Sequence, residues 1–432
     1  MKRDIQNGQL YWDGCSAQDL AETYGTPLYV FSQSAIEAEC RAIRDCFLSR
    51  YENTRAAYAA KAFSCLGIFR LMEREGFCLD VVSGGELYAA LQAQFPPERI
   101  EFNGNNKQPE ELEMAVEAGV GRIIIDGLDE LPIIEELCRA KGRRMKVLYR
   151  ITPGVKGDSH DYIVTGKKDS KFGVPIDEDI LLPYIKAAID SEYVDFLGLH
   201  FHVGSQLMDN AAHIKALEVL LGVMERVKEE YGFTMTELNL GGGFGIQYLP
   251  DQARSPYSYF LEPLMERIEA FSRKLGVSRP AVVIEPGRAI VGEAGMTLYR
   301  VGTTKEVRGV RKYVAVDGGM TDNIRPALYQ AQYHAAIDGR AEDRDTETVT
   351  VCGKCCESGD VLIKDIALPH PRRGDLLCVF STGAYGYSMS SNYNRLPKPA
   401  AVLCKDGRSA LLIRRETYAD LCRGDEIPDS LK

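Results

Sequence analysis

The sequence lacks any run of apolar residues long enough to cross a membrane, although 45% of its residues are hydrophobic. A membrane-spanning helix needs about 20 consecutive, mostly apolar residues. The opening segment, MKRDIQN, also lacks the apolar centre of a secretory signal peptide. We therefore expect a cytoplasmic protein that does not associate with membranes.

Clusters of basic residues are also missing. The 52 lysines and arginines are scattered among 62 acidic residues, and the net charge of −10 offers no positive footprint for nucleic acid. Of the twelve cysteines, only Cys352, Cys355 and Cys356 cluster, and no second Cys-x-x-Cys pair completes a zinc ribbon. In a long intracellular chain, free thiols are more typical than a disulfide framework.

The length of 432 residues exceeds the size at which a single hydrophobic core stops growing, so two domains are expected. In the first domain, short β-rich runs alternate with longer amphipathic runs, which is typical of βα units around a parallel sheet. The predicted strands are 55–60, 78–82, 99–103, 122–126, 146–151, 196–203, 237–240 and 281–285. Eight such strands favour an α/β architecture of the (β/α)8 TIM-barrel type over a doubly wound sheet.

The pattern changes after residue 291, where short strands follow one another without intervening helices. These strands are predicted at 296–301, 312–316, 346–351, 361–366, 375–380, 400–404 and 410–414. Such a series predicts an all-β domain, either a β-barrel or a sandwich. We place the barrel domain at residues 30–290 and assign residues 1–29 and 291–432 to the β domain.

Two of the predicted barrel strands end in residues suited to holding a flat carbonyl compound. Active groups of a TIM barrel lie at the carboxyl ends of its strands. Lys61 follows the first strand among alanines, where partial desolvation would make its amine a good nucleophile for a Schiff base, although most lysines are solvated surface groups. His200 and His202 share a face of the sixth strand. They could bind a metal, stack on a flat ring or simply be buried core histidines.

Two further strand ends suggest a phosphate and a pyridine. The glycines of the segment GGGFG at 241–245 would let backbone N–H groups approach a phosphate, although a tight turn explains them equally well. Their spacing fits neither a dinucleotide fold nor a P-loop. Glu285 precedes a Pro-Gly-Arg turn. A carboxylate on a pyridine nitrogen would keep that ring protonated and electron-withdrawing. Together the four strand ends predict one site.

These strand ends, with two further motifs, resemble a known family. The motifs are CESGD at 356–360 and YGYSMSSNYN at 385–394, and the segment 160–173 is similar as well. Over nearly its whole length the sequence resembles the pyridoxal-phosphate (PLP)-dependent decarboxylases of alanine-racemase-like fold, fold type III. Within them it is most similar to the diaminopimelate decarboxylases, carboxy-lyases of the last step of lysine biosynthesis. The resemblance implies decarboxylation of meso-2,6-diaminopimelate to L-lysine and CO2.

The resemblance assigns a role to each part of the site. It implies that Lys61 carries PLP as a Schiff base, that His202 stacks on the ring beside His200, that Glu285 meets the ring nitrogen, and that Asp80 neighbours the lysine. The residues that it implies for the phosphate are Ser205, Gly243, Pro286, Gly287, Arg288 and Tyr385.

The substrate side follows from the resemblance in the same way. Arg288, Arg325 and Tyr329, together with Tyr385, would bind the distal carboxylate end of the substrate, and Glu357 would accept its distal ammonium group. Cys356 would donate a proton to the α-carbon after CO2 leaves. In the family, Cys356 and Glu357 enter the active site of the other subunit, so a homodimer is implied.

Several alternatives stay open at this point. The same chemistry could act on D-ornithine, D-lysine, ornithine or arginine, but such substrates would leave Arg325 without a carboxylate. A racemase of this fold would place an arginine where this chain has Glu285. A non-catalytic, PLP-binding regulatory homologue would tend to lose Lys61 or Cys356, and a metal enzyme built on the histidine pair is a further alternative. Asn239, where the family often has Asp, departs from the usual pattern.

Overall fold

The computed structural model describes residues 4–155 and 170–432 of the chain. The chain divides into two compact units, and both are discontinuous in sequence. One unit, here called the barrel unit, comprises Ala38–Ile246 and Ala253–Ile290. The other, here called the β unit, comprises Met1–Glu37, Gln247–Gln252 and Val291–Lys432. No helix in the described part of the chain is long and apolar enough to span a membrane.

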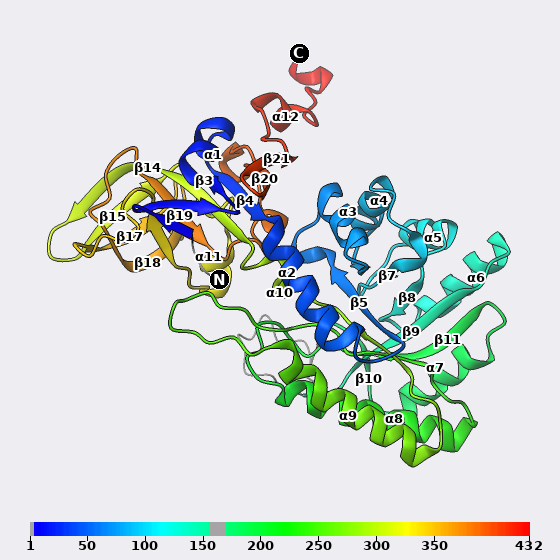
Figure 1. Cartoon of the computed structure of the whole chain (residues 1–432). Helices are drawn as coiled ribbons and strands as arrows, with labels where there is room; N and C mark the ends of the chain where they lie inside the picture. Colours follow the sequence, from blue (N-terminus) through cyan, green and yellow to red (C-terminus); the bar gives the residue numbers. More distant parts are fainter. Residues whose placement is uncertain (1–3, 156–169) are drawn as a thin grey trace. The chain divides into compact units, whose positions relative to one another are not determined.

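A ring of parallel strands forms the centre of the barrel unit (Figure 1). In the described residues its eight strands are β5 (Thr54–Ala59), β6 (Cys78–Val81), β7 (Ile100–Phe102), β8 (Arg122–Ile125), β9 (Met145–Thr152), β11 (Val194–His200), β12 (Glu237–Asn239) and β13 (Ala281–Ile284). Pairing of β8 with β9 and of β13 with β5 closes the ring, and the short β10 (Val174–Pro175) pairs with β9. The predicted TIM-type barrel is thus confirmed.

Helices between successive strands cover the outside of the barrel (Figure 1). They are α3 (Leu66–Arg74), α4 (Gly84–Gln92), α5 (Pro109–Ala118), α6 (Glu130–Lys141), α7 (Glu178–Asp190), α8 (Ala211–Tyr231) and α9 (Tyr257–Leu275). Local sequence sets their ends. The Ser83 side chain caps α4 by accepting the Glu86 N–H, and Gly142 and Gly276 end α6 and α9 in the left-handed conformation.

The barrel interior contains a buried ionic layer in addition to apolar side chains. Arg122 donates Nε and Nη2 to the two carboxylate oxygens of Glu237 at 2.5 and 3.0 Å. Arg55 also contacts Glu237 at 2.5 Å. This two-pronged geometry is the strongest form of an ion pair, and burial makes the loss of either partner costly. Because these residues lie on three strands that do not pair with one another, the ion pairs connect β5, β8 and β12 across the barrel.

Mixed pairing characterises the sheet of the β unit. Its strands in the described residues are β4 (Leu28–Ser32), β14 (Gly295–Val307), β15 (Arg311–Val316), β16 (Ala335–Ile337), β17 (Glu347–Cys352), β18 (Val361–Leu368), β19 (Leu376–Phe380), β20 (Ala400–Lys405) and β21 (Arg408–Ile413). Their main order is β18-β17-β15-β14-β4-β20-β21, and β19 pairs with β14 and β16. The pairs β15–β17 and β4–β20 are parallel, whereas the others are antiparallel.

The β unit also contains elements that the sequence analysis did not predict. A small sheet of β1 (Asp4–Gln6), β2 (Gln9–Trp12) and β3 (Cys15–Ser16) precedes α1 (Ala17–Tyr24). A short helix, α11 (Arg325–Tyr329), interrupts the expected series of strands, and a second one, α12 (Tyr418–Cys422), follows the last strand. The expectation of strands without helices was therefore wrong in detail, because helices of five residues are too short to show a helical period.

Candidate active site at the carboxyl ends of the barrel strands

Lys61 lies immediately beyond the carboxyl end of β5, in a short 3-10 turn between the fully buried Ala60 and Ala62. The lysine itself is half-buried. Burial raises the pKa of Asp80 and of Glu86. The positive charge of Lys61 lowers both pKa values and so opposes this effect. Lys61 therefore lies close enough to Asp80 to influence its ionisation.

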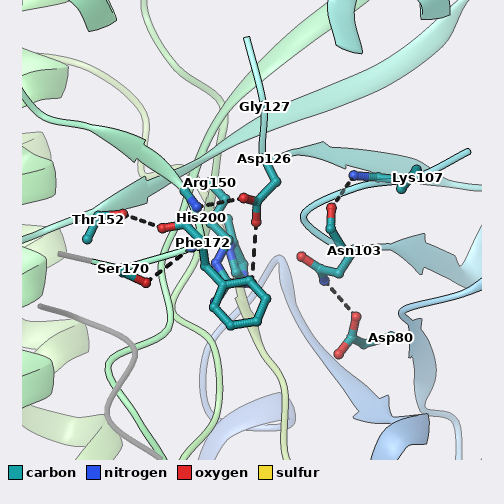
Figure 2. A network of polar contacts seen from close by, with 12 residues as sticks. Asp80, Asn103, Lys107, Asp126, Gly127, Arg150, Thr152, Ser170, Phe172 and His200 are labelled. Carbon is teal, nitrogen blue, oxygen red and sulfur yellow. Dashed lines mark hydrogen bonds and ion pairs between the residues drawn. The ribbon is translucent and has the colours of Figure 1, made fainter. Parts of the chain in front are cut away.

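Glu285, the residue that follows β13, is buried at the centre of a hydrogen-bond network. Its Oε1 accepts from the side-chain amides of Asn239 at 2.9 Å and Asn103 at 3.2 Å. Its other oxygen lies 3.1 Å from Nε2 of His200, the last residue of β11. Asn103 also donates to Asp80 at 2.6 Å, and the two side chains point toward each other in Figure 2.

The two buried carboxyl groups of this network differ in charge. Burial would raise the pKa of Glu285, but the neighbouring His200 and Lys61 outweigh it and hold that pKa well below its usual range. Burial and the negative charge of Glu285 raise the pKa of Asp80. Groups whose environments push their pKa values apart commonly have different chemical roles. Here Glu285 is the ionised member of the pair.

His202 follows β11 and contacts the glycine-rich segment. Its Nδ1 accepts the backbone N–H of Gly242 at 3.3 Å. Burial, reinforced by the positive charges of Lys61 and Arg150, lowers the pKa of His202 well below its ordinary value. The ring is therefore neutral near pH 7, which suits stacking on a flat, electron-poor ring better than an imidazolium would.

The loops after β11, β12 and β13 approach each other so closely that only glycine fits. A Cβ on Gly243, whose φ is +98°, would lie 2.4 Å from the carbonyl oxygen of Gly204. A Cβ on Gly242 would lie 2.1 Å from that of Glu285. Beside them, Nε and Nη2 of Arg288 donate to the Ser205 hydroxyl at 3.2 and 2.9 Å.

The turn after β13 completes this arrangement. The carbonyl oxygen of Pro286 accepts the backbone N–H of Ala59 at 3.2 Å, next to the end of β5. A Cβ on Gly287 would lie 2.9 Å from the Ala59 side chain. Pro286, Gly287 and Arg288 therefore lie at the same end of the barrel as Lys61. Backbone N–H groups, a hydroxyl and a guanidinium gathered together are the donor set that a phosphate prefers.

Three buried polar atoms around Glu285 fit the presence of a further polar group. Oδ2 of Asp80, Oδ1 of Asn103 and Nδ1 of His200 have no hydrogen-bond partner in residues 4–155 and 170–432. Buried polar atoms in folded proteins are nearly always paired. Lys61 supplies an amine, Glu285 an ionised carboxylate and His202 a neutral imidazole at one barrel end. Gly242, Gly243, Ser205 and Arg288 beside them form what is here called the phosphate cradle. The residues present therefore fit PLP.

A second polar cluster lies on neighbouring strands of the same barrel end (Figure 2). Arg150 near the end of β9 lies 3.6 Å from Asp126, which follows β8, and its guanidinium is 4.4 Å from the centre of the Phe172 ring. Asp126 accepts the backbone N–H of Gly173 at 2.6 Å. The described part of the family-like segment 160–173 is thereby fixed to the barrel, whereas residues 160–169 lie outside the described residues.

In the β unit, Arg325 begins α11 and Tyr329 ends it. Arg325 is only 5% exposed, and its guanidinium lies 6.0 Å from the centre of the Tyr329 ring. The backbone N–H of Arg325 donates to Oδ1 of Asn323 at 3.3 Å. The structure thus places two of the predicted substrate residues on one short helix.

Cys356 and Glu357 are exposed in the turn between β17 and β18. The backbone N–H of Cys356 donates to Oδ1 of Asn394 at 2.6 Å, which connects the two motifs CESGD and YGYSMSSNYN. The adjacent Cys355 is half-buried, and burial raises the pKa of its thiol to about 11. The thiol of Cys356 is therefore more accessible than the thiol of Cys355.

Tyr385 lies in the loop after β19, near the fully buried Ala384. Its φ of +61° falls in the left-handed region, which bulky side chains rarely adopt. Strained backbone of this kind is typical of functional positions. Tyr385 is thus a strained residue of the β unit.

Sequence reasoning missed two residues of the barrel network. Asn103, which follows β7, and Asn239, the last residue of β12, both hold Glu285, but the sequence analysis noted Asn239 only as a departure from the family pattern. The one feature of the sequence that could have identified these two asparagines is that each is a polar residue at the end of a predicted strand. Among the described residues, no group of three or more His, Cys, Asp or Glu side chains could hold a metal ion.

Replacing Gly243 by Ala tests the phosphate cradle. The new Cβ must displace the Gly204 carbonyl and adopt a strained φ, which typically costs about 1–3 kcal/mol. We expect Gly243→Ala to lower the affinity for PLP by about tenfold or more in a fluorescence titration. Gly222→Ala in α8 is the matched control, because a Cβ there meets nothing within 4 Å. Equal affinities of the two variants would contradict the assignment.

A family model and full-length relatives match this chain. Residues 33–292 match the model described as pyridoxal-dependent decarboxylase, pyridoxal binding domain. The chain is 48% identical to a diaminopimelate decarboxylase of Bacillus subtilis over 98% of its length and 96% of that protein. It is 42% identical to a diaminopimelate decarboxylase of Staphylococcus aureus, over 97% and 98% of the two chains.

Solved structures agree with this relationship. The crystal structure of diaminopimelate decarboxylase from M. jannaschii in complex with L-lysine superposes with a TM-score of 0.93. The two chains are 37% identical, and the match covers 100% of this chain and 99% of the other. The match includes both units, so the relationship extends beyond the pyridoxal-binding part. The chain therefore belongs to the diaminopimelate decarboxylases, which are PLP-dependent decarboxylases of fold type III.

Proposed function

We propose that this protein converts meso-2,6-diaminopimelate to L-lysine and CO2, with PLP held at the carboxyl ends of the barrel strands. The observation that carries the proposal is the ionised, buried Glu285 in the same cluster as Lys61. When PLP is bound, its protonated ring accepts the electrons that the departing carboxylate leaves behind. An ionised carboxylate beside the ring nitrogen favours the protonated ring, which suits decarboxylation.

The cofactor would be held by side chains with separate tasks. Lys61 would bind its carbonyl carbon, and the neutral His202 would pack on one face of its ring. Asn103, Asn239 and His200 would keep Glu285 in place. The phosphate would be bound by Ser205, Gly243, Pro286, Gly287, Arg288 and Tyr385. Asp80 would act beside Lys61, where its raised pKa favours a neutral carboxyl group that can donate a hydrogen bond.

The substrate's far end would be recognised mainly by residues of the β unit. Arg325, with Tyr329, Arg288 and Tyr385, would bind the distal carboxylate, because a guanidinium matches the planar shape of that group. Glu357 would accept the distal ammonium. Decarboxylation of D-ornithine, D-lysine, ornithine or arginine is less well supported, because none of these substrates offers Arg325 a distal carboxylate.

Cys356 would supply the proton to the α-carbon. Its accessible position supports this role, and the exposure of both Cys356 and Glu357 supports their entry into the active site of a second subunit in a homodimer. We further propose that residues 30–290 form the PLP-binding domain, and that residues 1–29 and 291–432 form the domain contributing these groups. The twelve free cysteines support a reducing, cytoplasmic location.

The substrate assignment is tested by measuring CO2 and lysine release from purified protein with PLP. We expect L-lysine from meso-diaminopimelate, and no CO2 from D-ornithine, D-lysine, L-ornithine or L-arginine. Turnover of one of these four alone would overturn the role of Arg325 and keep the cofactor assignment. A bound cofactor without any turnover would instead favour the regulatory alternative.

Removing the amine of Lys61 should remove covalent cofactor binding. In Lys61→Ala the near-visible absorbance of bound PLP should disappear, because no other residue would replace the lysine as the nucleophile. Lys146→Ala removes an exposed lysine of the same unit and should keep that absorbance. An unchanged absorption spectrum of Lys61→Ala would refute the site.

Replacing Cys356 by Ala should lower kcat by about 10²–10⁴-fold, the usual contribution of a general acid. Cofactor affinity, measured by the same absorbance, should not change. Cys355→Ala and Cys422→Ala are the controls, because the first removes the neighbouring thiol and the second another exposed one. A larger loss of kcat in Cys355→Ala than in Cys356→Ala would move the role to the neighbouring residue.

A further inference from the structure

The guanidinium of Arg325 lies among the rings of three tyrosines in the β unit. Its central carbon is 5.3 Å from the ring centre of Tyr248, 5.8 Å from that of Tyr333 and 6.0 Å from that of Tyr329. Tyr248 and Tyr333 contact each other edge to face, with ring centres 5.4 Å apart and planes at 90°. Both of these tyrosines are buried, as is Arg325.

The hydrogen bonds of Arg325 occupy one end of its guanidinium. Nη1 donates to the hydroxyl oxygen of Tyr333 at 2.6 Å and to that of Tyr248 at 2.9 Å. Because Nη1 carries two N–H bonds, the two phenols use both of them. Nε and Nη2 have no protein partner in the part of the chain that the structure describes, so the edge that they form offers two parallel N–H bonds. A carboxylate accepts such a pair of bonds in a two-pronged geometry.

The charge of Arg325 is also left uncompensated. Within residues 4–155 and 170–432, no carboxylate forms an ion pair with this buried guanidinium, and its hydrogen-bonding partners are neutral phenols. A buried cation without a counter-ion is unfavourable unless an anionic ligand joins it. Phenols fix the position of the guanidinium without neutralising it, whereas an aspartate or glutamate in their place would compete with the ligand.

Backbone and side-chain contacts hold Tyr248 in place. Oε1 of Gln252 accepts the N–H groups of Tyr248 and Leu249 at 3.0 and 3.1 Å. Oε1 of Glu293 accepts the N–H of Gln247 at 3.0 Å, and the Ser381 hydroxyl donates to the carbonyl oxygen of Gln247 at 3.1 Å. The segment Gln247–Gln252 is thus fixed within the β unit.

We propose that Tyr248 and Tyr333 are positioning residues that orient Arg325 toward the distal carboxylate of the substrate and thereby set the preference for carboxylate-bearing ligands. This inference rests on the role of Arg325 in the proposed function. The two phenols hold the guanidinium in one orientation before the ligand arrives, so less conformational freedom is lost on binding. Removal of either hydroxyl leaves one N–H of Nη1 without its partner. The guanidinium can then rotate, and the edge formed by Nε and Nη2 no longer faces the carboxylate.

The test measures inhibition by two ligands that differ by one carboxylate. L-lysine retains the distal carboxylate of the substrate, whereas 1,5-diaminopentane has the same carbon chain and amines without it. In Tyr248→Phe and Tyr333→Phe, we expect the inhibition constant for L-lysine to rise about tenfold and that for 1,5-diaminopentane to stay unchanged. KM for meso-diaminopimelate should rise in parallel, with kcat nearly constant.

Tyr299→Phe is the matched control. Tyr299 is a buried tyrosine of the same unit, and its hydroxyl has no hydrogen-bond partner in the described chain, so its removal should change neither inhibition constant. Thermal unfolding and bound-PLP absorbance verify that each variant is folded. Because the two tyrosines make separate bonds to Nη1, either single variant tests the inference if the other does not fold.

Arg325→Gln separates failure of this inference from failure of the proposed function. If Arg325→Gln leaves L-lysine inhibition unchanged, the arginine does not bind the carboxylate, and both the proposed role of Arg325 and this inference fall. If Arg325→Gln weakens L-lysine inhibition while Tyr248→Phe and Tyr333→Phe behave like Tyr299→Phe, only the positioning role is wrong. An equal loss of affinity for both inhibitors in the tyrosine variants would also overturn it, because it would indicate general disruption.

Discussion

Glu285 stays ionised inside the barrel because His200, Asn239 and Asn103 surround its carboxylate with hydrogen-bond donors and Lys61 adds a positive charge nearby. Each of these partners comes from the end of a different strand, so the arrangement requires a closed ring. An open sheet would leave the ends of β5 and β13 unpaired, and Lys61 would lose its place beside the carboxylate. The electrostatics of the site thus depend directly on the closure of the barrel.

Asn239 connects this carboxylate to the phosphate cradle. Its amide nitrogen donates to Glu285 and also to Glu101, each at 2.9 Å, and its carbonyl oxygen accepts the backbone N–H of Gly241 at the same distance. One neutral side chain therefore positions both the acid and the first glycine of the loop. An aspartate at this position would add a third carboxyl group beside Glu101 and Glu285, and burial would favour its protonation. The amide provides the same connection without that additional charge.

Sequence patterns predicted the barrel because its strands repeat one signal eight times, and each strand ends within a few residues of its expected position. They also singled out Lys61, the pair of His200 and His202, the glycine-rich segment 241–245 and Glu285 as candidate site residues, since these are chemically unusual residues at strand ends, and their roles stay predictions. Asn103 and Tyr248 escaped detection because a lone asparagine or tyrosine carries no periodic signal. Only the folded chain shows that Tyr248 reaches Arg325, 77 residues away. The short helix α11 was missed for a related reason, because five residues span little more than one turn.

The pairing of β4 in the β unit has a consequence for biosynthesis. Leu28 in this strand pairs with Leu298 of β14 on one side and with Ala400 of β20 on the other. A ribosome adding about 5–20 residues per second makes the second partner roughly 20–70 s after the first strand emerges. Until β14 is made, β4 is an apolar strand with two unpaired edges on the nascent chain, and one edge stays unpaired until β20 is made. Chaperones that bind extended apolar segments would therefore act on β4 before β14 is made.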